Sequence, residues 1–234
     1  MNFIYKEEIV NYDYFRNNNK ETVVFLHGWG GNKLSFNSTL NLLKISYNIL
    51  TITIPTISST KQVWNMHNYC DFVLHILNLH NIKNPVIICH SFGFRIALLL
   101  NQYICIKKLI ITGGAGIKKN NAFLRIKQRR NLLNLQQNKN LFLKIASQDY
   151  VALSNTNRQS FKNIINLNLR NFVRFKCPIL LFWGKQDLDT PIWIAKTIAS
   201  INNAKLVITN SDHFAYLKLG AFFNNSVLKF LNND

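Results

Sequence analysis

The chain has 234 residues, of which 48% are hydrophobic, which excludes a disordered protein and predicts a single α/β domain over residues 1–234. No apolar run approaches the roughly 18 residues that a membrane-spanning helix needs, and the N-terminus lacks the layout of a signal peptide. The four cysteines lie far apart without a C-x-x-C pair, which argues against a zinc site or disulfide framework and favours a reducing cytoplasm.

The formal net charge of +18 has two interpretations. Lysine, asparagine and isoleucine are abundant while aspartate and glutamate total 10, a bias that an AT-rich coding sequence produces by drift. The alternative is attraction to an acidic partner, such as nucleic acid, anionic lipid or an acidic carrier protein. No acidic residue occurs from Phe72 to Gln148, which supports a partner, but no nucleic-acid-binding motif accompanies the charge. We therefore expect no specific nucleic-acid binding.

The first half of the chain alternates predicted strands with predicted helices. Continuous apolar runs are typical of strands buried on both faces, and apolar residues at helical intervals indicate helices. In order, the pattern predicts an edge hairpin within residues 1–20, a strand at 22–26, a helix at 35–43, a strand at 49–54 that Pro55 stops, and a helix at 63–79.

The second half continues the alternation around one insertion. The basic, asparagine-rich segment 117–174 has helical spacing and no good strand, so it is interpreted as a helical insertion. The other predicted elements are a strand from residue 85, a sharp turn at 89–93, a helix to 100, strands at 108–112, 178–183 and 205–209, and helices at 191–200 and 215–231. Strands alternating with helices predict a mostly parallel, doubly wound sheet, whose ligands bind beyond the carboxyl ends of the strands.

Ser91 lies between the end of a predicted strand and the start of a predicted helix. At such a position the helix N–H groups point outward and the helix dipole favours negative charge. This is the geometry of a nucleophile elbow, whose usual pattern is G-x-S-x-G. Cys89 stands in place of the first glycine.

A serine hydroxyl needs a base within hydrogen-bond reach, and the base needs a third group that sets its tautomer. His213 follows the strand predicted at 205–209, and Asp187 follows the strand predicted at 178–183. Ser91, Asp187 and His213 therefore come from the ends of different strands at one edge of the sheet. We predict that they form a catalytic triad.

Asp189 competes with Asp187 for the role of the acid. Asp187 is preferred because it lies three residues beyond the turn at Gly184 and ahead of Pro191, which starts the next helix. In the alternative, Asp187 caps that helix and Asp189 is the acid.

An oxyanion intermediate needs two hydrogen-bond donors. The backbone N–H of Phe92, the residue after the serine, is one candidate. The N–H of Trp29 is the second, because the glycines around it let the backbone approach closely. His27 is interpreted as a structural residue that holds this loop by hydrogen bonds. No metal and no organic cofactor are expected.

Four motifs occur in a fixed order along the chain: HGWGG at 27–31, CHSFG at 89–93, WGKQD at 183–187 and DHF at 212–214. With them the chain resembles the α/β-hydrolase superfamily over essentially its whole length. Within it, the chain is similar to small bacterial carboxylesterases, including those that cleave the methyl ester of pimeloyl-[acyl carrier protein] in biotin synthesis. The resemblance implies an α/β-hydrolase fold, a serine esterase activity and a helical cap where 117–174 falls.

Several side chains are candidates for substrate binding. His90 lines the pocket or packs within the fold, and both interpretations are open. Arg125, Arg129 and Arg130 lie in the predicted cap, either as a solvated face or as a docking surface for an acidic acyl carrier protein. The expected substrate is a carboxylic ester, and the expected state is a monomer.

Three departures from the family pattern leave an alternative open. Cys89 replaces a glycine, Phe94 stands where a small residue is common, and the loop 55–60 lacks the glycines and leading aspartate of many relatives. A catalytically inactive α/β-hydrolase scaffold that serves as a binding protein is therefore the rival hypothesis.

Overall fold

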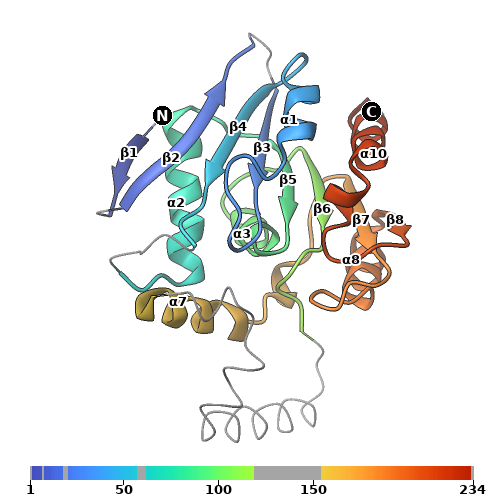
Figure 1. Ribbon diagram of the computed structural model, residues 1–234. Coiled ribbons are helices and arrows are strands. Elements are labelled where there is room, and N and C mark those ends of the chain that lie inside the picture. Colours follow the sequence, from blue (N-terminus) through green and yellow to red (C-terminus); the bar gives the residue numbers. More distant parts are fainter. Residues whose placement is uncertain (1, 7, 18–20, 57–61, 119–153, 233–234) are drawn as a thin grey trace, which may run out of the picture.

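The structure, a computed structural model, describes residues 2–6, 8–17, 21–56, 62–118 and 154–232. Its strands form one eight-stranded sheet in the order β1-β2-β4-β3-β5-β6-β7-β8 (Figure 1). The strands are β1 (Asn2–Tyr5), β2 (Glu8–Phe15), β3 (Thr22–Leu26), β4 (Asn48–Thr53), β5 (Val86–His90), β6 (Lys108–Thr112), β7 (Ile179–Gly184) and β8 (Lys205–Thr209).

Strand direction follows the predicted pattern. The hairpin β1–β2 pairs antiparallel within itself and against β4, whereas neighbours from β4 through β8 run parallel. The predicted α/β fold with a mostly parallel, doubly wound sheet is confirmed. Because β3 lies beside β5, the loop after β3 and the turn after β5 emerge next to each other at the carboxyl edge, where ligands of such sheets bind.

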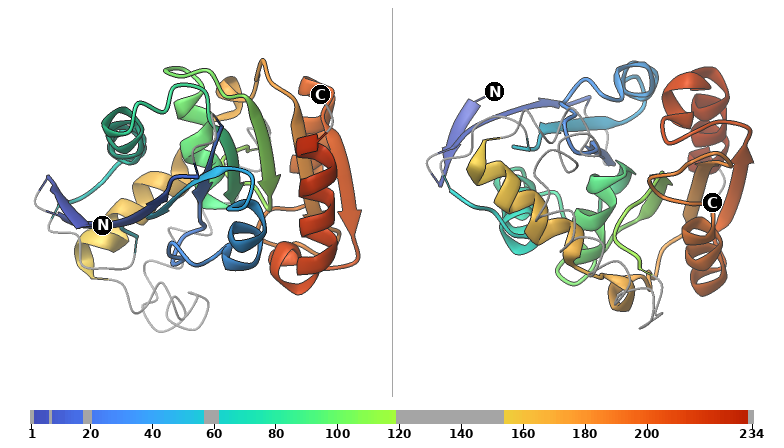
Figure 2. Two further views of the ribbon diagram at one scale, coloured as in Figure 1. Left: turned by 90° about the horizontal axis from the view of Figure 1, so that it is seen from above. Right: turned by 60° about the horizontal axis from the view of Figure 1, so that its bottom comes forward.

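Helices cover both faces of the sheet, as both views of Figure 2 show. Successive strand residues point to opposite faces, so Val24 and Ile87 join the core beneath α2, α3 and α8, while Val23 and Ile88 join the core beneath α1 and α10. The helices are α1 (Asn37–Leu43), α2 (Met66–Leu79), α3 (Phe92–Leu100), α7 (Asn155–Asn166), α8 (Trp193–Asn202), α9 (Ala215–Lys218) and α10 (Gly220–Asn232).

Four predicted helices have different bounds in the structure, and those predicted at 35–43 and 191–200 span Asn37–Leu43 and Trp193–Asn202. The helix predicted at 63–79 begins at Met66, because the Asn65 side chain caps it by accepting hydrogen bonds from the N–H groups of His67 and Asn68. The helix predicted at 215–231 is divided at Leu219 into α9 and α10. The helical spacing of apolar residues persists across the break, which is why the pattern does not reveal it.

The predicted insertion 117–174 lies only partly within the described residues. Its described part contains α7 and a short 3-10 helix at Arg170–Phe172. Helix α7 runs below the carboxyl ends of the central strands (Figure 1), and its Phe161, Ile164 and Ile165 face the pocket there. The domain bounds 1–234 and the full extent of the cap stay predictions. Within the described part of the chain, no helix is long and apolar enough to cross a membrane.

Candidate active site

Ser91 stands at the turn between β5 and α3 in a conformation that side chains rarely adopt, with φ of 46° and ψ of −106°. Its carbonyl oxygen accepts hydrogen bonds from the N–H groups of Phe94 and Ala115, and its own N–H donates to Thr112. Gly93 lets the turn sit tightly on β3, since a Cβ there would lie 2.1 Å from the carbonyl oxygen of Leu26. These contacts maintain the strained turn that presents the serine.

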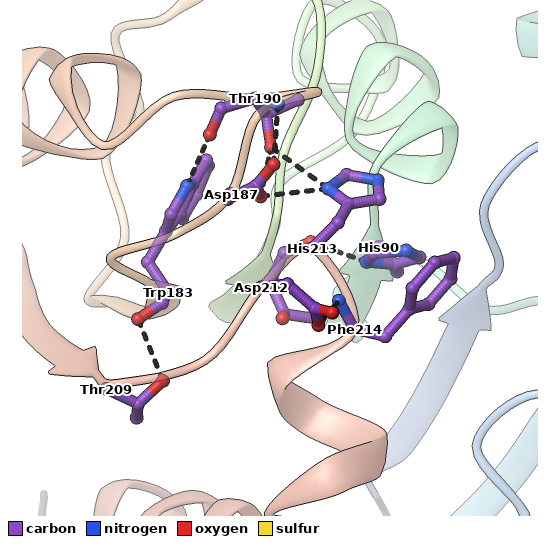
Figure 3. Close-up of polar contacts among 9 residues, drawn as sticks. His90, Trp183, Asp187, Thr190, Thr209, Asp212, His213 and Phe214 are labelled. Atoms are coloured by element: carbon purple, nitrogen blue, oxygen red, sulfur yellow. Dashed lines mark hydrogen bonds and ion pairs between the residues drawn. The ribbon is translucent and has the colours of Figure 1, made fainter.

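His213 and Asp187 are brought together, as Figure 3 shows. Nδ1 of His213 lies 2.8 Å from Oδ2 of Asp187, and the Asp187 side chain is buried. A carboxylate only accepts hydrogen bonds, so Nδ1 carries the proton and Nε2 is left as the basic nitrogen. Both His213 and Ser91 line one pocket, although no hydrogen bond joins their side chains. Such bonds are often long before substrate binds.

Thr190, which the sequence analysis missed, fixes the carboxylate. Its N–H donates to Oδ1 of Asp187 and its hydroxyl to Oδ2, each at 2.7 Å. Burial tends to raise the pKa of Asp187, but hydrogen bonds from His213 and Thr190 outweigh it and hold this pKa below its ordinary value. A threonine three residues after an aspartate, just before a helix, is a capping pattern that could have predicted this contact.

On its other side, His213 packs against His90, with ring centroids 4.7 Å apart (Figure 3). Nδ1 of His90 donates to the carbonyl oxygen of Thr112 at 2.9 Å. Burial, with a contribution from His213, lowers the pKa of His90 to about 3, so the ring is neutral at physiological pH. His90 lines the pocket and is buried in the fold, and its contact with a substrate stays a prediction. Gly113 leaves room here, since a Cβ would lie 3.0 Å from the His213 ring.

Asp189 is exposed at the pocket wall and makes no hydrogen bond to His213. Ligand atoms of Asp187, Asp189 and His213 lie within 4.8 Å of one another, a spacing that a metal ion could use. However, His213 Nδ1 already bonds Asp187, and Thr190 bonds both oxygens of that carboxylate. This donor set fits an acid–base pair better than a metal site.

Hydrogen bonds of the buried His27 side chain hold the loop after β3 in place. His27 accepts the N–H of Ile54 on Nε2 at 2.8 Å and donates from Nδ1 to the carbonyl oxygen of Gly28 at 2.7 Å. Burial lowers the pKa of His27 to about 4, which keeps the ring neutral, and its structural role is confirmed. Thr56, from the unusual 55–60 loop, accepts the N–H of Gly30, and residues 57–60 lie outside the described residues.

The two predicted oxyanion donors, the N–H groups of Trp29 and Phe92, have no acceptor among the described residues. Both residues line the pocket beside Ser91, and their rings meet edge to face with centroids 5.3 Å apart. Neighbouring N–H groups of this kind can stabilise negative charge that develops on a substrate oxygen.

The two departures at the elbow are accommodated by packing. Cys89 is fully buried, its Sγ lies 3.6 Å from the carbonyl oxygen of Ile110, and burial raises its thiol pKa well above the ordinary value. Phe94 fits because Gly114 leaves space, since a Cβ there would lie 2.7 Å from the ring. Neither side chain enters the pocket.

The pocket has a volume of about 800 Å³ and lies between the loop after β3, the elbow, α7 and the loops that carry Asp187 and His213. Four of its apolar side chains are also solvent-exposed and form its rim: Leu34, Ile165, Phe214 and Leu217. Its only described cation is Arg95, which the sequence analysis did not assign to the site. The predicted binding residues Arg125, Arg129 and Arg130 lie outside the described residues.

An eight-stranded sheet with a serine at a strained strand–helix turn and a histidine–aspartate pair on adjacent loops defines an α/β hydrolase. Residues 23–223 match the Alpha/beta hydrolase family, and the chain belongs to that family. The predicted family and the prediction of a hydrolase enzyme are confirmed.

The chain is similar to two named bacterial proteins. The uncharacterised hydrolase YugF of Bacillus subtilis is 24% identical, and the alignment covers 84% of each chain. A pimeloyl-[acyl-carrier protein] methyl ester esterase of Wigglesworthia glossinidia brevipalpis is 22% identical, over 83% of this chain and 87% of that protein. In fold, the chain is similar to the crystal structure of an enol-lactonase from Burkholderia xenovorans, with a TM-score of 0.78, 15% identity and full coverage of both chains.

Proposed function

We propose that the protein is a serine hydrolase of carboxylic esters, with Ser91 as nucleophile, His213 as general base and Asp187 as the residue that orients His213. The observation that carries the proposal is the partly buried Asp187–His213 hydrogen bond of 2.8 Å, whose histidine lines the same pocket as Ser91. The apolar rim of that pocket suits an acyl chain better than a charged polymer.

In the proposed reaction, Nε2 of His213 takes the proton of the Ser91 hydroxyl while Oγ bonds to the ester carbonyl carbon. The resulting oxyanion accepts hydrogen bonds from the N–H groups of Trp29 and Phe92. When the tetrahedral intermediate collapses, the C–O bond to the alcohol breaks and His213 returns its proton to the leaving oxygen. Water, activated by His213 in the same way, then releases the acid from Ser91.

The test is hydrolysis of p-nitrophenyl esters of short fatty acids by the wild-type protein and by Ser91→Ala. We expect the substitution to lower kcat by roughly 10⁴-fold or more, because the nucleophile is lost while the fold stays intact. Equal, slow hydrolysis by both proteins would contradict the proposal.

A finer proposal is that the ester is carried by an acidic acyl carrier protein, as in biotin synthesis, within a reducing cytoplasm. It is supported by the net charge of +18, by the free state of all four cysteines and by the similarity to the Wigglesworthia enzyme. Binding to an acyl carrier protein should then weaken as salt rises from low to physiological concentration. Binding that does not respond to salt would count against this docking.

The rival function is that of an inactive hydrolase scaffold that binds a partner. The packing of Cys89 and Phe94 without entry into the pocket favours the enzyme instead. A fluorophosphonate probe separates the two, because it labels only an activated serine. Labelling of the wild-type protein and none of Ser91→Ala would exclude the scaffold, and no labelling of either would favour it.

A further inference from the structure

Arg95 is a buried cation that the proposed reaction does not use. It lies on α3, is 8% exposed and is the one cationic side chain among the described residues that line the pocket. Burial lowers the pKa of Arg95 to about 10, so the guanidinium is charged at neutral pH. A charge in this position needs either a structural partner or a ligand, because burying it unpaired is costly.

Its structural partners account for only one nitrogen. Nη1 donates to the carbonyl oxygens of Ile164 and Leu167, at 2.9 and 3.1 Å, and so holds the C-terminal end of α7. A guanidinium has five N–H groups, which leaves three on Nε and Nη2. Neither of these nitrogens has an acceptor among the described residues, and Arg95 makes no ion pair there.

The unused edge of the guanidinium has a specific chemistry. Nε and Nη2 form a planar fork that matches the two oxygens of a carboxylate, and such a bidentate pair is both strong and directional. The pocket's one described carboxylate, that of Asp189, belongs instead to the loop beside His213. Since the described residues offer this edge no carboxylate, a carboxylate of the ligand fits it.

Arg95 also stands close to the proposed nucleophile along the chain. It follows Ser91 by four residues, within the first turns of α3, and both residues line the same pocket. The segment after β6 confines it on another side, since a Cβ at Gly116 would lie 3.2 Å from Cγ of Arg95. A group bound to Arg95 would thus lie in the same pocket as the carbonyl that Ser91 attacks.

We propose that Arg95 binds a carboxylate of the substrate through Nε and Nη2, so that the preferred ester is a half-ester of a short dicarboxylic acid. This inference rests on the proposed esterase function, and it names a free half-ester as the substrate, which is an alternative to the ester carried by an acyl carrier protein. Arg95 would then be a specificity residue, and its contact with α7 would couple the bound carboxylate to the helix that covers the pocket.

The test compares the monomethyl esters of succinic, glutaric and adipic acid with the methyl esters of the monocarboxylic acids of similar length. For the wild-type protein we expect kcat/KM to be at least roughly 10-fold higher on the best half-ester than on its neutral counterpart, as a charge-assisted hydrogen bond allows. Arg95→Gln should lower kcat/KM on the half-ester at least roughly 10-fold more than on the neutral ester, so that the preference is abolished. Arg174→Gln, which removes an exposed arginine outside the pocket, should retain the preference.

The inference would be overturned if the wild-type protein had no preference for half-esters over neutral esters. It would also be overturned if Arg95→Gln lowered kcat/KM equally on both kinds of ester, because a purely structural role of Arg95 gives that result. If Arg95→Gln does not fold, Arg95→Lys replaces it, because lysine keeps a charge and a donor for α7 but lacks the fork. Half-ester binding to Ser91→Ala, measured by calorimetry, provides a readout without turnover. If no ester is hydrolysed, the esterase proposal fails, but the carboxylate site can still be tested by this binding measurement. Weaker half-ester binding when Arg95→Gln is added to Ser91→Ala supports the carboxylate site. Undiminished half-ester binding by that double variant overturns it.

Discussion

His213 is oriented by two side chains of one loop, Asp187 and Thr190. Asp187 accepts the Nδ1 proton, and Thr190 bonds both oxygens of the carboxylate, so the aspartate has little freedom to rotate. The exposed Asp189 contributes no such bond. Because only a fixed tautomer leaves Nε2 free as a base, Asp187 is the acid on which the proposed activity depends.

At this scale we predict different effects for the two aspartates. Asp187→Asn should lower kcat by about 10⁴-fold, because an amide can donate to Nδ1 and stabilise the wrong tautomer of His213. Asp189→Asn, an equivalent change two residues away, should lower kcat by less than about 10-fold. The measurement is steady-state hydrolysis of a p-nitrophenyl ester by both variants. The reverse ranking would show that Asp189 is the acid.

At the scale of elements, the strand β7 supports the segment that carries His213. The N–H groups of Lys185 and Gln186 donate to the carbonyl oxygens of Thr209 and Ser211. Gly184 lies directly against the same segment, since a Cβ there would lie 2.2 Å from the carbonyl oxygen of Asp212. Backbone contacts between two loops therefore set the position of His213.

We predict that Gly184→Ala damages both stability and activity. The added methyl group has no space, so the free energy of unfolding should fall by about 1–3 kcal/mol. Displacement of the segment before His213 by about 1 Å should lower kcat by roughly 100-fold. Urea unfolding and ester hydrolysis measure the two effects.

Gly220→Ala is the matched control. Gly220 begins α10, and a Cβ there would meet no atom within 4 Å. Its stability should be unchanged or higher by up to about 1 kcal/mol, because alanine favours a helix more than glycine does. Equal destabilisation by both substitutions would contradict the steric explanation.

At the scale of the whole molecule, two neutral histidines are buried beneath the active site. Burial lowers the pKa of His27 to about 4 and that of His90 to about 3, below the ordinary value of about 6.5 in an unfolded chain. Between these values the unfolded chain binds protons that the folded protein does not. Stability is therefore complete above about pH 6.5 and is lost as the pH falls toward 4 and 3.

We predict that the free energy of unfolding declines by about 1.4 kcal/mol per pH unit for each buried histidine below pH 6. The measurement is urea unfolding at pH 7, 6 and 5. His27→Gln should remove one histidine's share of this slope, whereas the same substitution at the exposed His67 should leave the slope unchanged. A slope that His27→Gln does not alter would count against the neutral, buried state of His27.

Much of the fold could be predicted because the signals are local. The predicted strand at 22–26, a mostly apolar run, matches β3, and the strand at 108–112 matches β6 residue for residue. The helix division at Leu219 and the start of α2 at Met66 could not, since both depend on backbone geometry and capping that periodicity does not register. The spacing from Gly184 favours Asp187 over Asp189 as the acid, and the hydrogen bond between Asp187 and His213 agrees with this prediction.

Apolar runs and short motifs are properties of neighbouring residues, so they predict the order of the elements, the strand ends that carry Ser91, Asp187 and His213, and membership of a known superfamily. The folded chain adds that Thr190 fixes the carboxylate and that Arg95 lines the pocket while it holds α7. Those facts depend on contacts between residues far apart in the chain. They also depend on which face of α3 packs into the core and which face lines the pocket.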